Sequence, residues 1–261
     1  MKNALVALLV LLAAGCFRGP RIDTSRHARS QDSRVRFLVL HFTQESWSNS
    51  LRILTEGDVS SHYLVRDNPV RIYRLVDENR RAYHAGLSSW KGQTQLNSAS
   101  IGIEIVNGGA REGPEGLSFA DYPPAQVDAV IDLVRDIAAR HGIPGENILG
   151  HAEIAPQRKL DPGPKFPWQR LADAGLIPWP DPAAVAGKLA AYRSRLPAVA
   201  WFQARLAQHG YETPRTGELD PPTRRVLGIF QMKYRPRCCD GTPDAETAAL
   251  LDVLTTPPPE G

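Results

Sequence analysis

Apolar runs separated by turn signals predict a set of β-strands in the first part of the chain. Residues 36–43 (RFLVLHFT) and 100–107 (SIGIEIVN) are continuous apolar runs with the length and β-branched content of buried strands. Shorter runs at residues 59–65 and 71–76 flank a turn at Asp67-Asn68-Pro69. These segments together predict a β-sheet that is largely buried.

The clearest helical pattern covers residues 123–142. Its apolar side chains recur at the spacing of one helix face, at Val127, Val130, Ile131, Val134, Ile137 and Ala138. Gly142 suits the left-handed conformation that ends many helices. With a further short strand near Ile148, the pattern predicts the α/β class, with a mixed central β-sheet covered by helices.

The chain then changes character at a proline-rich stretch, PWPDP, at residues 178–182. A linker helix is expected within residues 181–197, followed by a small three-helix domain at residues 198–256. Asp220-Pro221 is a good helix start, because a capping carboxylate precedes a proline in the first turn. Three short helices bury little apolar surface alone, so we expect them to pack on the main domain, residues 35–180.

The first residues match an export signal. Lys2 precedes an apolar run too short to span a membrane as a mature helix, and small residues follow it. Residues 12–16 (LAAGC) also resemble a bacterial lipobox, with Ala13 where Leu is usual. Residues 1–16 are therefore expected to be a lipoprotein signal in which Cys16 is lipidated, and residues 17–34 a tether; a plain secretory signal is the alternative. Phe17, in place of Asp, implies by the same analogy an outer-membrane anchor facing the periplasm.

Composition and charge exclude several other classes. A hydrophobic content of 42% and a charged content of 23% are ordinary for a soluble globular protein. The net charge of +3 and the lack of a basic stripe with interleaved aromatics argue against nucleic-acid binding. The adjacent residues Cys238 and Cys239 rarely bond to each other, so no disulfide framework or cysteine metal site is predicted.

Candidate chemistry gathers in the loop at residues 150–164 (GHAEIAPQRKLDPGP). His151 and Asp161 offer an imidazole and a carboxylate, both of which are Zn²⁺ ligands. They can converge only if this Gly/Pro-rich loop folds back. A catalytic zinc needs a third protein ligand, which must come from elsewhere.

His41 is the preferred third ligand because it lies near the end of an apolar strand, with His62 and His84 as other candidates. Glu104 is also unusual, since the two-residue period of its strand sets it on the face opposite Ile103. A carboxylate there is costly unless it is paired or functional. It is compatible with a general base beside a metal or with a salt bridge at the sheet surface.

Several segments together resemble one enzyme family. LVLHFT, SSHYLV, AYHAG, NSASIGIEIVN and GHAEIAPQRKLDPGPKFPW resemble, in the same order, the zinc-dependent N-acetylmuramoyl-L-alanine amidases of the AmpD type, which include peptidoglycan recognition proteins and phage amidases. WFQARLAQHGY, TGELD, TRRVLGIFQ and DGTPDAETAALL are similar to the peptidoglycan-binding domain 1 module.

The amidase resemblance implies a role for each candidate. It implies that His41, His151 and Asp161 bind one Zn²⁺ per chain. It implies that Glu104 is the catalytic base and that Lys159 stabilises the developing oxyanion, although Lys159 could instead form a salt bridge with Asp161.

Four further residues are assigned to the substrate side of the site. In this family His62 and His84 line or support the cleft. Trp90 and Asn97 lie in the loop before the Glu104 strand. Trp90 is suited either to stacking on a sugar ring or to packing within the loop.

The resemblance implies an exported amidase that hydrolyses the bond between N-acetylmuramic acid and L-alanine, in peptidoglycan or anhydromuropeptides, during cell-wall turnover or recycling. Its second domain would hold it on the wall, and no protein partner is implied. One alternative is a non-hydrolytic peptidoglycan-binding protein, but such proteins typically lack a zinc ligand. Another is a cytoplasmic recycling amidase, against which the export signal argues.

Overall fold

The computed structural model describes residues 19–114 and 116–256. It contains two units, residues 1–32 and 33–261. In the first unit, the described residues 19–32 form no helix or strand and are exposed. The signal and lipobox predicted for residues 1–16, with Cys16, lie outside the described residues.

The second unit is built on a mixed β-sheet with the strand order β3-β2-β6-β1-β9. Its strands are β1 (Phe37–Phe42), β2 (Tyr63–Arg66), β3 (Arg71–Arg74), β6 (Ser100–Ile105) and β9 (Ile148–Gly150). Strand β1 pairs in parallel with β6 and β9, and β6 pairs in parallel with β2. Only the β2–β3 pairing at one edge of this sheet is antiparallel within the described residues. The predicted mixed sheet is confirmed.

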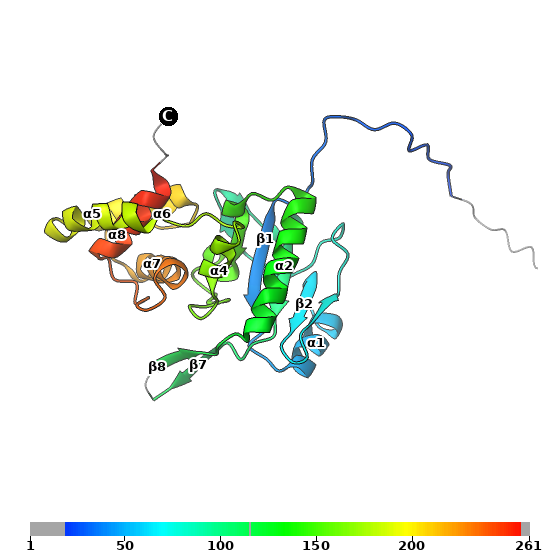
Figure 1. Cartoon of the computed structure of the whole chain (residues 1–261), viewed down its shortest axis with the longest axis horizontal. Coiled ribbons are helices and arrows are strands. Elements are labelled where there is room, and N and C mark those ends of the chain that lie inside the picture. The colour runs from blue at the N-terminus through cyan, green and yellow to red at the C-terminus, as the bar shows by residue number, and fades with distance from the viewer. Residues whose placement is uncertain (1–18, 115, 257–261) are drawn as a thin grey trace, which may run out of the picture. The chain divides into compact units, whose positions relative to one another are not determined.

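Helix α2 (Pro124–His141) covers one face of this sheet (Figure 1). The helix begins with prolines in its first turn and ends at Gly142, which adopts a φ of 65°. Its apolar face packs on side chains that point to the same side of β1 and β6, namely Leu38, Leu40, Ile101, Ile103 and Ile105. The two-residue period therefore directs His41 and Glu104 to the opposite face of the sheet.

Helix α1 (Trp47–Glu56) was not predicted from the sequence. The Ser46 side chain caps it by accepting a hydrogen bond from the backbone of Asn49. Leu54 of α1 packs with Leu64 of β2 and Val106. The helix was missed because polar residues interrupt its few apolar positions.

The remaining elements of the main domain are short. They are β4 (Ser89–Trp90), β5 (Gln93–Thr94), β7 (Ala110–Gly113), β8 (Gly116–Phe119), α3 (His151–Ile154), α4 (Trp168–Asp173) and 3₁₀ turns at Leu96–Ser98 and Gly145–Asn147. Pairs β4–β5 and β7–β8 are small antiparallel ribbons. No helix within residues 19–114 and 116–256 combines the length and apolar character needed to cross a membrane.

The C-terminal part is helical, with α5 (Pro182–Ser194), α6 (Val199–His209), α7 (Pro221–Tyr234) and α8 (Ala245–Thr255). As the sequence suggested, the Asp220 carboxylate caps α7 by accepting the N–H of Thr223. Helix α5, expected as a linker, packs against α8 (Figure 1). Its Lys188 and Tyr192 both donate to Asp252 of α8, at 2.7 and 2.9 Å.

These C-terminal helices pack on the main domain, as their small size led us to expect. One apolar cluster joins Phe37, Val39 and Trp90 of the main domain to Phe202 and Phe230 of α6 and α7. Val39 and Phe37 lie on the sheet face opposite α2. Helix α2 and the C-terminal helices therefore bury opposite faces of β1.

Candidate metal centre

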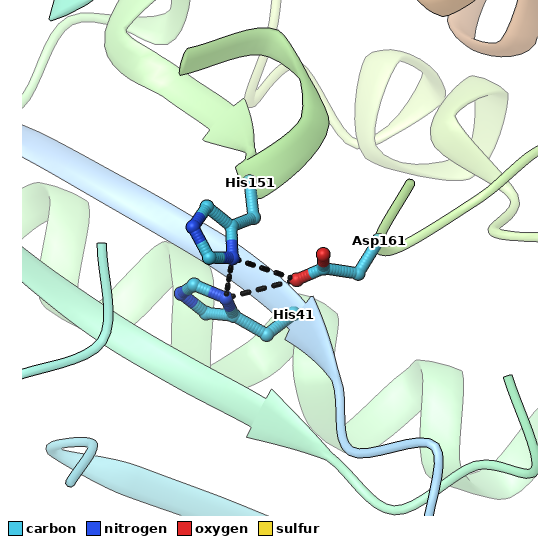
Figure 2. Close-up of side chains that lie close together, drawn as sticks. All are labelled: His41, His151 and Asp161. Carbon is cyan, nitrogen blue, oxygen red and sulfur yellow. Dashed lines mark hydrogen bonds and ion pairs between the residues drawn. The ribbon is translucent and has the colours of Figure 1, made fainter. Parts of the chain in front are cut away.

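Three buried side chains converge at the carboxyl ends of β1 and β9 (Figure 2). The Nδ1 atoms of His41 and His151 lie 2.9 Å apart. The Asp161 Oδ2 atom lies 3.0 Å from each of them. This His-His-Asp group is a possible metal-binding site, since each residue offers one ligand atom.

The local structure explains why these three residues meet. His41 is near the end of β1, and His151 opens α3 directly after the neighbouring strand β9. The loop after α3 folds back as expected, because the Ala152 N–H donates to the Asp161 carbonyl at 2.8 Å. Gly150 is needed at the start of α3, since a Cβ there would come within 2.7 Å of the Pro162 ring.

Hydrogen bonds to the far side of each imidazole determine which nitrogen carries the proton. The His151 Nε2 atom lies 3.1 Å from the Ala85 carbonyl, which can only accept. Its Nε2–H therefore donates there, and its Nδ1 carries a lone pair. A histidine held in this way presents Nδ1 as a ligand atom.

His84 does the same for His41. The Ser100 hydroxyl donates to the Leu96 carbonyl at 2.6 Å, so it accepts from His84 Nε2 at 3.1 Å. His84 Nδ1 is then left to accept from His41 Nε2 at 3.0 Å. Gly102 makes room for this ring, because a Cβ there would lie 2.5 Å from it.

This donor set fits a metal cation. Two imidazole lone pairs and a carboxylate oxygen face one another within about 3 Å, an arrangement that is repulsive unless a positive charge lies between them. The three atoms are close enough to share one ion at the Zn–N and Zn–O distances of about 2.0–2.2 Å. These three atoms would hold the ion and leave one position of a four-coordinate zinc for water or substrate.

Burial keeps the histidine of β1 neutral. Desolvation, and then the nearby His151, lower the pKa of His41 to about 4. Burial also lowers the pKa of His84 well below its usual value. Burial alone would raise the pKa of Asp161, but the charge of a protonated His151 and hydrogen bonds from protonated imidazoles outweigh it and hold the pKa below its usual range, so the carboxylate is ionised before the imidazoles lose their protons. All three groups are thus in the state that binds metal or supports a ligand.

Glu104 lies directly across from His41 in the β1–β6 pairing. Its Oε2 atom is buried and has no hydrogen-bond partner among the described residues. Burial, and then the charge of Asp161, raise the pKa of Glu104 well above its usual value, while Lys159 opposes this shift. A carboxylate with a raised pKa and an uncommitted oxygen beside a metal site is suited to proton transfer.

A cavity of about 360 Å³ opens beside these side chains. It is lined by His41, His151, Asp161, Glu104, His84 and Lys159, and also by Tyr83, Arg158 and Arg225. The structure therefore brings the ammonium of Lys159 to the same cavity as the candidate ligands. No ion pair between Lys159 and Asp161 occurs in the described part of the chain.

Two other predicted residues support the site without lining the cavity. His62 is buried; its Nδ1 accepts from the Gly102 N–H and its Nε2 lies 3.0 Å from the Arg80 carbonyl. It is not part of the ligand group, and it does not line the cavity. The Asn97 side chain accepts from the N–H groups of His84 and Ala85, at 3.0 and 2.7 Å. Asn97 therefore holds the loop that carries His84, and it does not line the cavity.

The sugar-stacking role considered for Trp90 is wrong. Its side chain is 1% exposed and lies outside the metal-site cavity. The indole packs edge-on against His209 and Tyr211 from the C-terminal part. The second reading, a packed loop aromatic, is the correct one.

Some relevant residues were not identified from the sequence. Ser100 fixes the tautomer of His84, and the Ala85 carbonyl fixes that of His151. The role of Ser100 follows only from its hydrogen bond to the Leu96 carbonyl, which the sequence does not show. Arg158 is next to Lys159 in the metal-ligand loop, so the sequence could have identified it as a residue of the site. Arg225 belongs to α7, far along the chain, and carried no signal at all.

Comparisons with known proteins agree with this geometry. A sequence profile of the N-acetylmuramoyl-L-alanine amidase family matches residues 31–164, and a peptidoglycan binding domain profile matches residues 195–251. The chain is 43% identical to N-acetylmuramoyl-L-alanine amidase AmiD of Escherichia coli, over 94% of each chain.

Two solved structures resemble nearly the whole chain. One is E. coli AmiD in complex with the substrate anhydro-N-acetylmuramic acid-L-Ala-D-gamma-Glu-L-Lys, with a TM-score of 0.82 and coverage of 90% of this chain and 94% of that one. The other is AmpDH3 from Pseudomonas aeruginosa in complex with anhydromuramic pentapeptide, at 38% identity, a TM-score of 0.83 and coverage of 89% and 96%. With its His-His-Asp group and its two matching domains, the chain belongs to the N-acetylmuramoyl-L-alanine amidase family.

Proposed function

We propose that this chain hydrolyses the amide bond between the lactyl group of N-acetylmuramic acid and L-alanine, in peptidoglycan or anhydromuropeptides, during cell-wall turnover or recycling. The observation that carries the proposal is the convergence of His41, His151 and Asp161 beside Glu104, in a cavity open to a substrate. Family membership and the substrates named in the related complexes support it.

Zinc is the metal that we propose for the site, with one ion per chain. Two neutral imidazoles and one carboxylate are a common ligand set for a catalytic zinc, which keeps one position open. When bound, such an ion would lower the pKa of a water molecule and polarise the scissile carbonyl. The remaining chemistry belongs to the protein side chains.

Glu104 and Lys159 are proposed to carry out that chemistry. The Glu104 carboxylate accepts a proton from the attacking water as the new C–O bond forms. The Lys159 ammonium stabilises the negative charge that develops on the carbonyl oxygen. Glu104 then delivers its proton to the alanine nitrogen as the C–N bond breaks, which leaves a muramyl carboxylic acid and a free stem peptide.

Digestion of purified peptidoglycan and of a soluble anhydromuropeptide tests this function. We expect free stem peptides and peptide-free glycan by mass spectrometry. A chelator should abolish both products, because it removes the ion that would activate the water and polarise the carbonyl. Added zinc should restore them. Binding without cleavage, even with zinc present, would instead support the non-hydrolytic wall-binding alternative.

The hydrogen-bond chain from His41 through His84 to Ser100 makes a second prediction. His84→Phe keeps an aromatic ring but removes the acceptor for His41 Nε2. Zinc affinity should fall by about 10- to 100-fold, the usual effect of losing a partner that orients a ligand. Competition with a fluorescent chelator measures this. The matched control His209→Phe replaces a histidine outside the site and should leave the affinity unchanged; equal losses in both variants would refute the orienting role of His84.

We also propose an organisation for the whole chain. Residues 35–180 form the amidase domain, residues 181–197 connect it to the second domain, and residues 198–256 bind peptidoglycan. Residues 1–16 act as a lipoprotein signal, with Cys16 as the lipidated residue and residues 17–34 as a tether to the outer membrane on the periplasmic side. The lipobox-like sequence and the peptidoglycan binding profile support this arrangement.

A further inference from the structure

Arg225 belongs to a C-terminal helix but lines the cavity of the metal site. Its Nε donates to the Pro156 carbonyl at 3.0 Å, which fixes the guanidinium against the loop that carries His151 and Asp161. The start of α7 is held to the same loop by Gln157, whose side chain donates to the Pro222 carbonyl. The helix that supplies Arg225 is thus docked beside the candidate active site.

The terminal nitrogens of Arg225 remain available. Within the described residues they form no hydrogen bond or ion pair, whereas the Nε atom is bonded to the Pro156 carbonyl. The other cavity arginine differs, because Arg158 uses its Nε and one terminal nitrogen on the carbonyls of Ala85 and Leu87. Arg225 therefore presents an exposed, anchored fork of donors toward the cavity.

The cavity has a clear division of charge. Its carboxylates Asp161 and Glu104 lie at the metal end, and Glu45 at the rim is hydrogen-bonded to Asn49. Lys159 is assigned to the scissile carbonyl. Among the described residues, Arg225 is a cavity cation with no role in the proposed reaction and with uncommitted terminal nitrogens, whereas Arg158 is held by the backbone carbonyls of Ala85 and Leu87.

The proposed substrate carries an anion close to the bond that is cut. In the ligand of the AmiD complex, glutamate is joined to L-alanine through its amino group and to L-lysine through its γ-carboxyl group. This linkage leaves the α-carboxylate free on the residue next to L-alanine. In an extended chain, that carboxylate carbon lies within about 7 Å of the scissile nitrogen. A guanidinium can bind such a carboxylate through two parallel hydrogen bonds.

We propose that Arg225 binds the free α-carboxylate of the γ-linked glutamate in the stem peptide. The inference rests on the proposed function and adds to it: a helix of the domain expected to hold the wall also determines which peptide the amidase domain accepts. Arg225 would act in substrate recognition and leave the chemical step to Glu104 and Lys159.

The test compares an acid substrate with its amide. The full zinc-loaded chain and its Arg225→Gln variant are given anhydro-N-acetylmuramic acid-L-Ala-γ-D-Glu-L-Lys, or the analogue whose glutamate α-carboxylate is a carboxamide. We expect kcat/KM on the acid to fall by about 10- to 100-fold in the variant, mainly through KM, as for loss of a charged hydrogen bond. On the amide, the two proteins should agree within about twofold.

Two controls sharpen the result. Arg224→Gln changes the adjacent arginine, which bonds Thr242 and does not line the cavity, and should behave as the unaltered chain. An analogue amidated only at the peptide's C-terminal carboxylate should still show the full loss with Arg225→Gln. If the loss disappears on that analogue, or is equal on the acid and the carboxamide, the proposal is overturned.

A binding measurement separates this inference from the proposed function. The free tripeptide L-Ala-γ-D-Glu-L-Lys and its glutamate carboxamide are titrated calorimetrically into both proteins. A preference for the acid that is lost in Arg225→Gln supports the inference even if no bond is cut. Equal affinities for acid and amide in the unaltered chain reject it, even if the amidase reaction proceeds.

Discussion

Glu104→Gln should lower kcat for amide hydrolysis by about 10²- to 10⁴-fold, the usual contribution of a general base. The amide side chain has nearly the same shape as the carboxylate but cannot accept the proton of the attacking water. The ligand atoms of His41, His151 and Asp161 are unchanged by this replacement. Zinc content, measured by elemental analysis, should therefore stay at one ion per chain while the rate of product formation falls.

Glu45→Gln is the matched control for this prediction. Glu45 lines the same cavity, but it is exposed and does not belong to the strand pair in which Glu104 faces His41. Its replacement should change kcat by less than about twofold. Comparable losses in both variants, or loss of zinc from Glu104→Gln, would show that Glu104 acts through the charge or structure of the cavity and not as the base.

Lys233→Met should reduce the free energy of unfolding by about 3–5 kcal/mol, the cost of removing one partner from a buried ion pair. The Lys233 Nζ atom lies 3.0 Å from both Glu153 oxygens, and the two residues are 6% and 2% exposed. The variant leaves the Glu153 charge buried between the main domain and α7. Denaturant unfolding of the metal-free chain, compared at constant m, measures the loss.

The same variant should also affect the metal centre. Glu153 accepts the Gly150 N–H at 2.7 Å, directly before His151, so its position helps to hold that ligand. We therefore expect weaker zinc binding together with lower stability. The control Lys188→Met breaks a partly exposed pair with Asp252 and should cost no more than about 1 kcal/mol. Equal losses in the two lysine variants would contradict a special role for the buried pair.

Much of the fold follows from local sequence pattern. Each of three patterns can be recognised within one short stretch of sequence: the continuous apolar run of β1, the alternation in β6 and the helical spacing of α2. The helix ends at Gly142 and Asp220 are equally local, since each depends on one residue's conformation or side chain. Alternation alone also placed Glu104 opposite the isoleucine face of its strand.

Part of the site was predictable for a different reason. His151 and Asp161 belong to one short loop, so their convergence required only that the loop fold back. Selecting His41 from three histidines was harder. It depended on the expected end of a buried strand and on the family resemblance, because no local pattern distinguishes it from His62 or His84.

The sequence by itself determined the strands, the main helices, the helical C-terminal part and the residue types available for metal binding. These properties depend on side-chain period and backbone preference within a few residues. Only the tertiary structure decided which residues from distant parts of the chain lie next to one another. It set Glu104 across from His41, buried Trp90 under α6, and brought Lys233 and Arg225 from α7 to the metal-ligand loop. Such contacts join residues 60 or more positions apart along the chain, and they form because apolar faces must be covered, which local periodicity does not encode.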